Sequence, residues 1–352
     1  MRGATAAGIE QFNLRHDQGA SSGKSRIIRK AYFEDAGYVP LLLRAYELWD
    51  DVERRTGSNL VRVTGLLLAG AESSEVIAGA RFAAKKYDLK IDVLSARDLR
   101  AKYPRLRVRD GEVGVYEHDG GIVFPEAAVD AHLKLAETFG ANIFEQRTVT
   151  SWEVGAGEIV RLRLADGAVV EARSAVFALG PWFAHEMRAL GVPLSVQRNV
   201  QLWFEPDSSS WDAGQFPPFL IDRPEHPRLY GFPDLGDGVK AAFHEHGELT
   251  EPEALRRTVD DDDVLPVTRA LKGWMPGAAA RFRAAKACMY SLTPDRHFVI
   301  DRHPRHGNVV VCGGFSGHGF KFASVVGEIG AQLALDRATP FDIQFLSLAR
   351  FA

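Results

Sequence analysis

The stretch VVVCGGFSGHGFKFASVVGEIG, residues 309–330, decides the fold more than any other part of the chain. A continuous apolar run predicts a buried strand, a glycine-rich turn follows it, and a helical pattern begins near Phe320. Glycine lets the backbone approach a ligand closely, and a helix start offers free N–H groups and the positive end of a dipole. This turn therefore favours an anion or an electron-rich ring. Lys321 is either a surface lysine or a cation that receives a carboxylate above the bound ligand.

Further β and α patterns surround this stretch. Turn residues and periodicity predict helices at 40–56, 74–87, 125–139, 263–273 and 320–335, and strands at 60–68, 91–94, 148–154, 159–164, 168–178 and 308–312. Between 192 and 290 the pattern predicts mostly short strands and turns. We therefore expect an α/β fold in which a nucleotide-binding domain is assembled from separated segments and a second, mixed α+β domain is inserted.

Composition excludes several classes of protein. The 352 residues are 46% hydrophobic and 25% charged, with a formal net charge of -3, so no basic field predicts nucleic-acid binding. No apolar run approaches the ~20 residues that span a bilayer. Two widely separated cysteines, Cys288 and Cys312, are typical of a reducing compartment, and we expect a cytoplasmic protein without a metal site. The acidic run at 260–263 indicates a solvated helix start.

The N-terminus raises a problem. Gly8-Ile9-Glu10 resembles the end of a nucleotide-binding strand, with an acid placed to hold a ribose. A glycine-rich phosphate loop is expected about 20 residues before that acid, but only nine residues precede Glu10. We expect the first strand, the loop and most of the first helix to be absent from this chain, through a misassigned gene start, a deletion or an assembly fault. Loss of that central strand would leave strand edges exposed.

Four motifs identify a family. They are SRIIRKAYFEDAGYVPLLLRAYELW (25–49), LYGFPDLGDGVKAAFH (229–244), ACMYSLTPDRHFVID (287–301) and SGHGFKFASVVGEI (316–329). Together they resemble the monomeric sarcosine oxidase and N-methyl-L-tryptophan oxidase family of flavin-dependent amine oxidases, which have the D-amino-acid-oxidase-like fold. The resemblance implies a Rossmann-like FAD-binding domain, truncated at its N-terminus, from 1–66, 121–193 and 293–352. It implies a substrate domain with a mixed antiparallel sheet from 67–120 and 194–292.

The resemblance also implies the cofactor contacts. Cys288 matches the cysteine that carries FAD covalently, although a buried small hydrophobe is the alternative, whereas Cys312 lies in an apolar strand and is expected to be core. The implied FAD contacts also include Glu10, Ser25, Val149, Gly180, Gly317, His318, Gly319 and Lys321. Ser22 stands where relatives often carry histidine, so one contact to the flavin edge departs from the family pattern.

Substrate-site residues follow from the same resemblance. Arg26 is expected against the flavin ring, and Arg29 with Lys321 on the substrate carboxylate, because guanidinium forms a fork that matches a carboxylate. The alternative for the arginines is a basic surface turn. Lys240 and His244 are four residues apart and share one face of a strand. Lys240 is expected to promote oxygen reduction, and His244, Tyr230 and Tyr290 to line the pocket. An exposed His244, with His246 equally plausible in its place, is the alternative.

These assignments imply oxidation of an N-methyl amino acid, such as sarcosine or N-methyl-L-tryptophan. The products would be the demethylated amino acid, formaldehyde and hydrogen peroxide, with molecular oxygen as the acceptor and the enzyme a monomer. Pipecolate, proline and glycated amino acids stay open as substrates. A different class of function is also open: a catalytically inactive remnant that cannot bind FAD.

Overall fold

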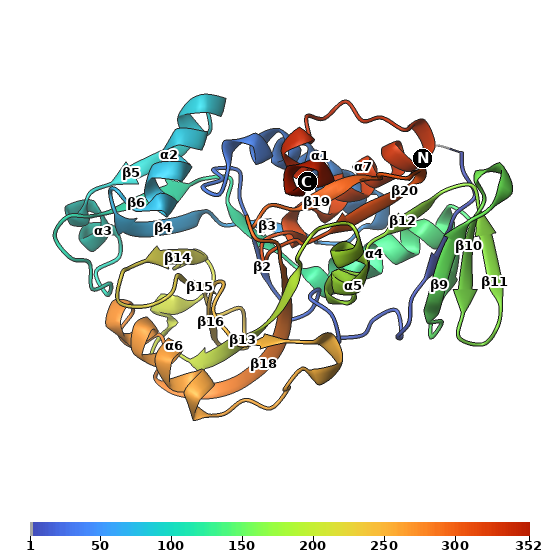
Figure 1. The fold of residues 1–352 in the computed structure, drawn as a ribbon. Coiled ribbons are helices and arrows are strands. Elements are labelled where there is room, and N and C mark those ends of the chain that lie inside the picture. The colour runs from blue at the N-terminus through green and yellow to red at the C-terminus, as the bar shows by residue number, and fades with distance from the viewer. Residues whose placement is uncertain (1–2) are drawn as a thin grey trace.

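The computed structural model describes residues 3–352, and a nine-stranded sheet dominates it (Figure 1). Its order is β17-β13-β16-β15-β14-β4-β6-β5, with β18 paired to β13. The pairing of β14 with β4 is parallel and the other pairings are antiparallel. The strands are β4 (Leu66–Ala71), β5 (Ile91–Leu94), β6 (Glu112–Glu117), β13 (Ser195–Glu205), β14 (Phe219–Asp222), β15 (Leu229–Phe232), β16 (Val239–Phe243), β17 (Leu249–Thr250) and β18 (Arg281–Leu292).

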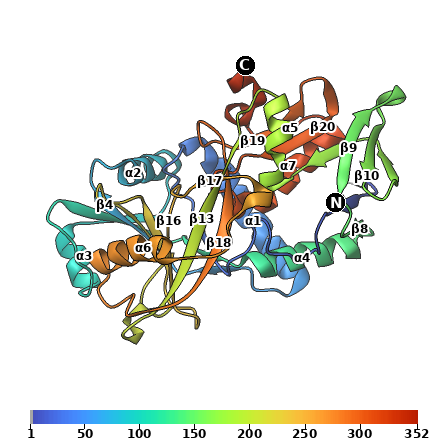
Figure 2. The same ribbon diagram turned by 60° about the horizontal axis from the view of Figure 1, so that its bottom comes forward.

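Helices cover this sheet and bury its apolar side chains. Helix α6 (Asp261–Trp274) packs Leu271 and Trp274 against Val239 and Phe219 of the sheet, beside α3 (Ala96–Lys102). Figure 2 shows α6 beside α3. Helix α2 (Glu75–Tyr87) covers β4 and β6 on their other face. The acidic run at 260–263 starts α6 as predicted, because Asp260 and Asp263 form a capping box.

The predicted strand, turn and helix at 309–330 are confirmed. Strand β20 (His306–Gly313) lies between β12 (Ala175–Phe177), which is parallel to it, and β19 (Val299–His303). A short 3₁₀ turn (Phe320–Phe322) leads into α7 (Ala323–Asp336), which packs with α1 (Val39–Thr56) on the core that contains Cys312. Helix α1 has proline in its first turn and ends at Gly57 with a φ of 68°, also as predicted.

Two predictions about strands are wrong. Residues 60–68 form two strands in different sheets, β3 (Val61–Val63) and β4, because Gly65 turns the chain between them at a φ of +77°. Residues 168–178 also divide, into β11 (Val169–Ala172) and β12, which pair with different strands. Between 192 and 290 the prediction of mostly short strands holds for β14, β15, β16 and β17, which contain two to five residues, whereas β13 and β18 contain 11 and 12.

Two small sheets complete the arrangement. One contains β9 (Val149–Val154), β10 (Val160–Leu164) and β11, and the other contains β2 (Arg26–Ile28), β7 (Gly121–Val123) and β3. Helix α4 (Pro125–Thr138) follows β7, and α5 (Ala184–Ala189) precedes β13. The chain enters and leaves the nine-stranded sheet between strands β3 and β4, β6 and β7, β12 and β13, and β18 and β19. The domain boundaries given above stay a prediction.

The parallel part of the fold is interrupted. Strand β1 (Ala7–Ile9) pairs with β8 (Asn142–Phe144) in a separate two-stranded sheet, and β12 pairs with β20 in another. Within residues 3–352, the second edges of β1 and β12 pair with no strand. Val176 on β12 is 45% exposed, whereas strands of parallel sheets are normally buried. The two parallel pairs therefore do not join into one sheet within the described residues.

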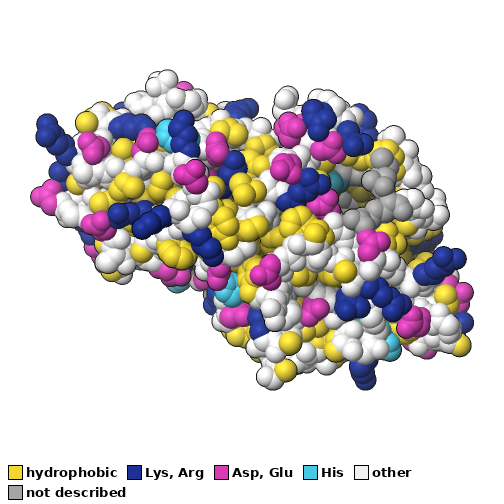
Figure 3. Space-filling model, turned by 90° about the horizontal axis from the view of Figure 1, so that it is seen from above, with side chains coloured by type: hydrophobic (Ala, Val, Ile, Leu, Met, Phe, Trp, Pro, Cys, Tyr) yellow, Lys and Arg dark blue, Asp and Glu magenta, His cyan; other side chains and the backbone are white. Residues whose placement is uncertain are grey.

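The surface carries charges of both signs. Figure 3 shows basic and acidic side chains interspersed on one face, without a large field of either sign. Among the residues described, no helix is both long enough and apolar enough to span a bilayer.

The fold makes α1 a support for the glycine-rich turn, and this can be tested. The Trp49 indole Nε1 donates to the carbonyl of Lys321 at 2.9 Å within the core. Trp49→Phe removes this donor and leaves a small cavity, so we expect the free energy of unfolding to fall by about 2 kcal/mol. Urea denaturation measures the change. Phe82→Leu, at a side chain that is 62% exposed, is the control and should shift stability by less than about 0.5 kcal/mol. Equal midpoints for Trp49→Phe and the unmodified protein would contradict the assignment.

Candidate active site

One face of the nine-stranded sheet gathers most of the predicted catalytic side chains. Alternate residues of a strand share a face, and directly paired residues share it across the ladder. Lys240 pairs with Phe232 of β15 and Trp203 of β13. His244 follows the end of β16, and its ring centroid lies 6.3 Å from that of Tyr230 and 5.8 Å from that of Tyr290. The structure therefore brings His244, Tyr230 and Tyr290 together beside Lys240.

Lys240 is a buried cation without a carboxylate contact of its own among the described residues. It is 2% exposed, and its Nζ donates to Gly23 O (2.6 Å), Ser25 O (3.0 Å) and Ser25 Oγ (3.3 Å). Burial, and then the charge of Arg26, hold the pKa of Lys240 well below its ordinary value. Arg26 itself donates to the carbonyls of Ala20 and Ser25, so it fastens this loop. Lys240, Ser25 and Arg26 thus form one cluster.

A second cluster lies at the start of α7. The Lys321 ammonium is buried and donates to the carbonyl of His318 at 2.8 Å. The His318 ring contacts Tyr32 Oη at 2.5 Å and the carbonyl of Arg296 at 3.0 Å, which suits a residue that shapes the turn. Burial lowers the pKa of His318 to about 4. Burial and the charge of Arg29 lower the pKa of Lys321 to about 7.

Arg29 is joined to a residue that the sequence reasoning missed. Its Nη2 lies 2.6 Å from both carboxylate oxygens of Glu34, and the guanidinium lies 4.1 Å from the centre of the Tyr32 ring. Burial disfavours the charged carboxylate, but Arg29 and nearby cations prevail and lower the pKa of Glu34 to about 2. Glu34 lies within the motif at 25–49. An acidic residue so close in sequence to Arg26 and Arg29 was the feature from which this ion pair could have been predicted.

Gly317 joins the turn to the sheet. Its φ is +78°, and a Cβ there would lie 2.2 Å from the Tyr290 ring, so only glycine permits this contact. Gly319 is equally confined, because a Cβ would lie 2.5 Å from the Phe315 side chain. The pocket wall of β18 and the start of α7 therefore lie in direct contact.

The two cysteines have different surroundings. Cys312 is packed in the core with α7, and burial raises its pKa to about 12, which confirms it as a core residue. Cys288 is 3% exposed, and its Sγ accepts a hydrogen bond from Gln201 Nε2 at 3.3 Å. Among the described residues, four buried side-chain oxygens have no hydrogen-bond partner. One is Ser22 Oγ, and the other three lie on β13, the strand that pairs with the strand of Cys288: Gln197 Oε1, Asn199 Oδ1 and Gln201 Oε1. Unpaired acceptors and a thiol fit a ligand that carries donors and a reactive carbon, as a flavin ring does.

The residues predicted to contact the adenosine and diphosphate of FAD do not form such a cluster. Glu10 Oε1 accepts from the amide of Phe12 at 2.8 Å, which is a local turn contact. Val149 begins β9, and Gly180, at a φ of +56°, begins a 3₁₀ turn (Gly180–Phe183). In Figure 1 β9 lies on the right, far from β15 and β16. The residues present therefore fit the ring of a flavin better than its diphosphate.

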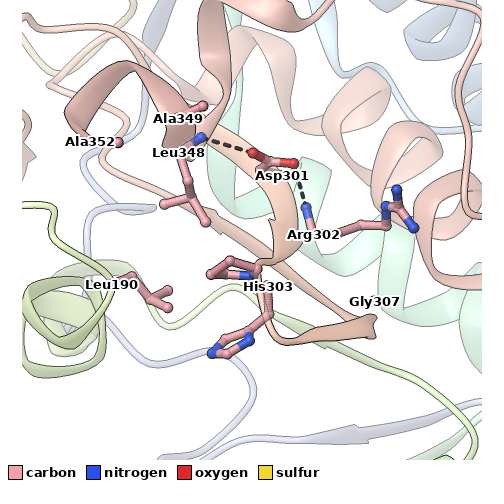
Figure 4. Close-up of a pocket in the computed structure, with 9 residues that line it drawn as sticks. Leu190, Asp301, Arg302, His303, Gly307, Leu348, Ala349 and Ala352 are labelled. Atoms are coloured by element: carbon pink, nitrogen blue, oxygen red, sulfur yellow. Dashed lines mark hydrogen bonds between the residues drawn. The ribbon is translucent and has the colours of Figure 1, made fainter.

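Two surface pockets lie apart from these clusters. Figure 4 shows one of about 430 Å³, where the amide of Leu348 donates to Asp301 and none of the predicted site residues forms the lining. Another, of about 470 Å³, is lined by His246, Phe243 and Arg269 among others. His246 therefore lines a separate pocket, whereas His244 packs against Tyr230 and Tyr290. Within residues 3–352, no group of three or more His, Cys, Asp or Glu side chains is placed to hold a metal ion.

The whole chain is similar to known flavoenzymes. Residues 2–333 match the model of the family described as FAD dependent oxidoreductase. A monomeric sarcosine oxidase of Streptomyces avermitilis is 40% identical over 360 aligned residues, which cover 100% of this chain and 92% of that protein. An N-methyl-L-tryptophan oxidase of Yersinia pestis is 34% identical over 338 residues, covering 96% and 90%.

Solved structures share the fold. NikD, an unusual amino acid oxidase essential for nikkomycin biosynthesis, matches with a TM-score of 0.85 at 23% identity, over 98% of this chain and 91% of that one. L-proline dehydrogenase from P. horikoshii matches with a TM-score of 0.82 at 17% identity, over 99% and 98%. The α/β fold predicted from the sequence is thereby confirmed.

The buried ammonium of Lys321 makes stability depend on pH. Its folded pKa of about 7 lies below its unfolded value, so the unfolded chain binds more protons between these values and stability rises with pH from about 7 to 10. Lys321→Met removes the buried charge, and we expect stability at pH 6 to increase by on the order of 3 kcal/mol, with a smaller gain at pH 9. Thermal denaturation at both values measures this. Lys30→Met, at a partly exposed lysine paired with Asp119, is the control. An equal gain in stability of Lys321→Met at both pH values would contradict the assignment of a buried charge to Lys321.

Proposed function

This chain belongs to the family of FAD-dependent oxidoreductases, and from that premise we propose that it oxidises an N-methyl amino acid such as sarcosine or N-methyl-L-tryptophan. The products would be the demethylated amino acid, formaldehyde and hydrogen peroxide, with molecular oxygen as acceptor. The observation that carries this proposal is the pair of buried cations Arg29 and Lys321. Their charged groups lie 4.1 and 5.3 Å from the centre of the same Tyr32 ring.

Two cations near one ring suit a substrate carboxylate. Arg29 already holds Glu34, so a substrate carboxylate would share or replace that contact, while Lys321 has only the carbonyl of His318 as a recorded hydrogen-bond acceptor. A carboxylate brought to Lys321 would restore its charged form, because an anion raises the pKa of a nearby ammonium. Binding an amino acid thus compensates a charge that the fold buries at a cost.

The remaining side chains would serve the amine and the oxygen. A bound flavin would supply the acceptor for the two electrons removed from the substrate C–N unit. Burial lowers the pKa of His244 to about 3, so its ring is neutral and can hydrogen-bond the amine without repelling a cation. Tyr230 and Tyr290 would wall the same space. Lys240 would place a donor and, when protonated, a positive charge where oxygen gains electrons.

We further propose that FAD is attached through Cys288 and that Arg26 and Ser25 hold the loop against its ring, with Gly317, His318, Gly319 and Lys321 at its opposite edge. Glu10, Val149 and Gly180 would contact the adenosine and diphosphate. We propose a monomer in the cytoplasm; the sarcosine oxidase of Streptomyces avermitilis is monomeric by name. A second candidate is an inactive remnant unable to bind FAD, which the unpaired edges of β1 and β12 favour.

Covalent FAD is the first property to measure. Acid precipitation of the purified protein should give a yellow pellet whose intact mass exceeds that of the chain by one FAD. Cys288→Ser should release its FAD into the acid supernatant, whereas Cys312→Ser should retain it, because Cys312 is core. Peroxide release with N-methyl amino acids then identifies the substrate. A colourless pellet at the mass of the bare chain would reject the oxidase in favour of the remnant.

The contact between Arg29 and Glu34 gives an independent test of carboxylate binding. Glu34→Gln leaves a buried guanidinium without its counter-charge, so we expect stability to fall by about 3 kcal/mol or more. Sarcosine should raise the unfolding temperature of this variant more than that of the unmodified protein, since its carboxylate replaces the missing one. Glu47→Gln, in an exposed helical ion pair with Arg44, is the control and should change stability by less than about 1 kcal/mol. The same sarcosine response in both proteins would argue against Arg29 as the carboxylate site.

A further inference from the structure

A row of buried amides lies on the inner face of β13. Gln197, Asn199 and Gln201 alternate along the strand and therefore share a face, and they stand opposite Tyr290, Cys288 and Lys286 of β18 in the ladder. The neighbouring residue Leu202 points to the apolar core on the other face. Such a position in a sheet would ordinarily be filled by β-branched or aromatic side chains.

These amides are not fully satisfied. The carbonyl oxygen of each is buried and has no hydrogen-bond partner. Asn199 donates to the carbonyl of His246 at 3.4 Å, and Gln201 donates to Cys288 Sγ at 3.3 Å. A buried polar group without a partner is destabilising and is uncommon in native folds. Groups that oppose stability are expected at functional sites, and this row lies against Cys288, so we assign it a role in what Cys288 does.

Gln201 is held in place from the side opposite the cysteine. A Cβ on Gly23 would lie 2.1 Å from Gln201 Oε1, so glycine at this position leaves the room that the amide occupies. The backbone of Gly23 is itself fixed, because its N–H donates to Glu126 and its carbonyl accepts from Lys240 Nζ at 2.6 Å. The Gln201 amide therefore lies between an anchored loop and the sulfur of Cys288.

We propose that Gln201 is a positioning residue that holds Cys288 Sγ for attachment to FAD. This inference rests on the proposed function. A thiol reacts as its thiolate, and an amide N–H stabilises sulfur when it carries the negative charge. Joining Sγ to the 8α carbon of the flavin releases the thiol proton and one methyl proton. It leaves two electrons on the flavin ring, which molecular oxygen removes as hydrogen peroxide. Gln201 supplies the donor that orients Sγ, and no atom of Gln201 is consumed.

The test compares bound FAD with covalent FAD after the cofactor is added to protein prepared without it. In Gln201→Leu the N–H donor is lost, and we expect the rate of covalent attachment to fall about tenfold while total FAD binding is retained. Gln201→Glu, which keeps the size and replaces the donor by an acceptor, should behave alike. Gln332→Leu is the matched control, since it removes a buried amide on α7 that bonds to Thr339 and not to Cys288, and it should attach FAD at the rate of the unmodified protein.

A second readout does not need FAD. Iodoacetamide labels Cys288 in the cofactor-free protein, and the ratio of its rates at pH 7 and pH 10 cancels differences in access. We expect this ratio to fall about tenfold in Gln201→Leu and to stay unchanged in Gln332→Leu. Cys312 reports on folding, because it stays unlabelled while the core is intact.

The outcomes separate the two proposals. If the unmodified protein binds no FAD, the proposed function fails, and the labelling ratio alone decides the role of Gln201. Attachment or labelling in Gln201→Leu at the level of the Gln332→Leu control would overturn the inference. Labelling of Cys312 in Gln201→Leu would show that this variant unfolds. In that case Gln201→Glu takes its place, and its attachment rate and labelling ratio are compared with those of the control.

Discussion

The burial of positive charge constrains the rest of this structure. Arg29, Lys240 and Lys321 are all buried, yet among the described contacts only Arg29 has a carboxylate, Glu34, in direct hydrogen-bonding contact. The two lysines are held by backbone carbonyls, those of Gly23 and Ser25 for Lys240 and that of His318 for Lys321. Moving an ammonium out of water is costly unless such acceptors converge on it. Each turn that offers these carbonyls is in turn fixed by a helix, through Glu126 of α4 or Trp49 of α1.

The nine-stranded sheet divides its two faces between stability and chemistry. On one face Val239, Ala241 and Phe243 of β16 pack beneath α6 in a dry core. On the other, Lys240 of the same strand is grouped with the amide row of β13 and with Cys288 and Tyr290 of β18. A strand displays its side chains alternately, so a single strand can serve both purposes without loss of pairing. The free-energy cost of the buried polar groups on one face is offset by the apolar side chains that are buried on the other face.

The interrupted parallel sheet affects the two ends of a dinucleotide unequally. Strands β1 and β12 each present an unpaired edge, and Glu10 is engaged in a local turn. The ring end does not depend on those edges. The residues proposed for that end come from β13 and β16, which pair on both sides, from β18, which pairs with β13, and from the start of α7, which packs in the core. The residues proposed for the flavin ring and those proposed for the diphosphate therefore lie in parts of the fold that differ in how far their strands are paired.

The sequence by itself determined whatever depends on short-range periodicity and caps. It predicted the strand, glycine turn and helix at 309–330, the ends of α1 at Pro40 and Gly57, and the shared face of Lys240 and His244. These follow from backbone geometry that repeats every two or every 3.6 residues. It could not show that Gly65 sends 60–68 into two sheets. Nor could it show that Glu34 pairs with Arg29 or that Tyr32 reaches His318, 286 residues away. Only the tertiary structure decided these contacts, including Gln201 on Cys288. They depend on which strands pair, in which register, and on which charges are buried together, and no local pattern encodes those choices.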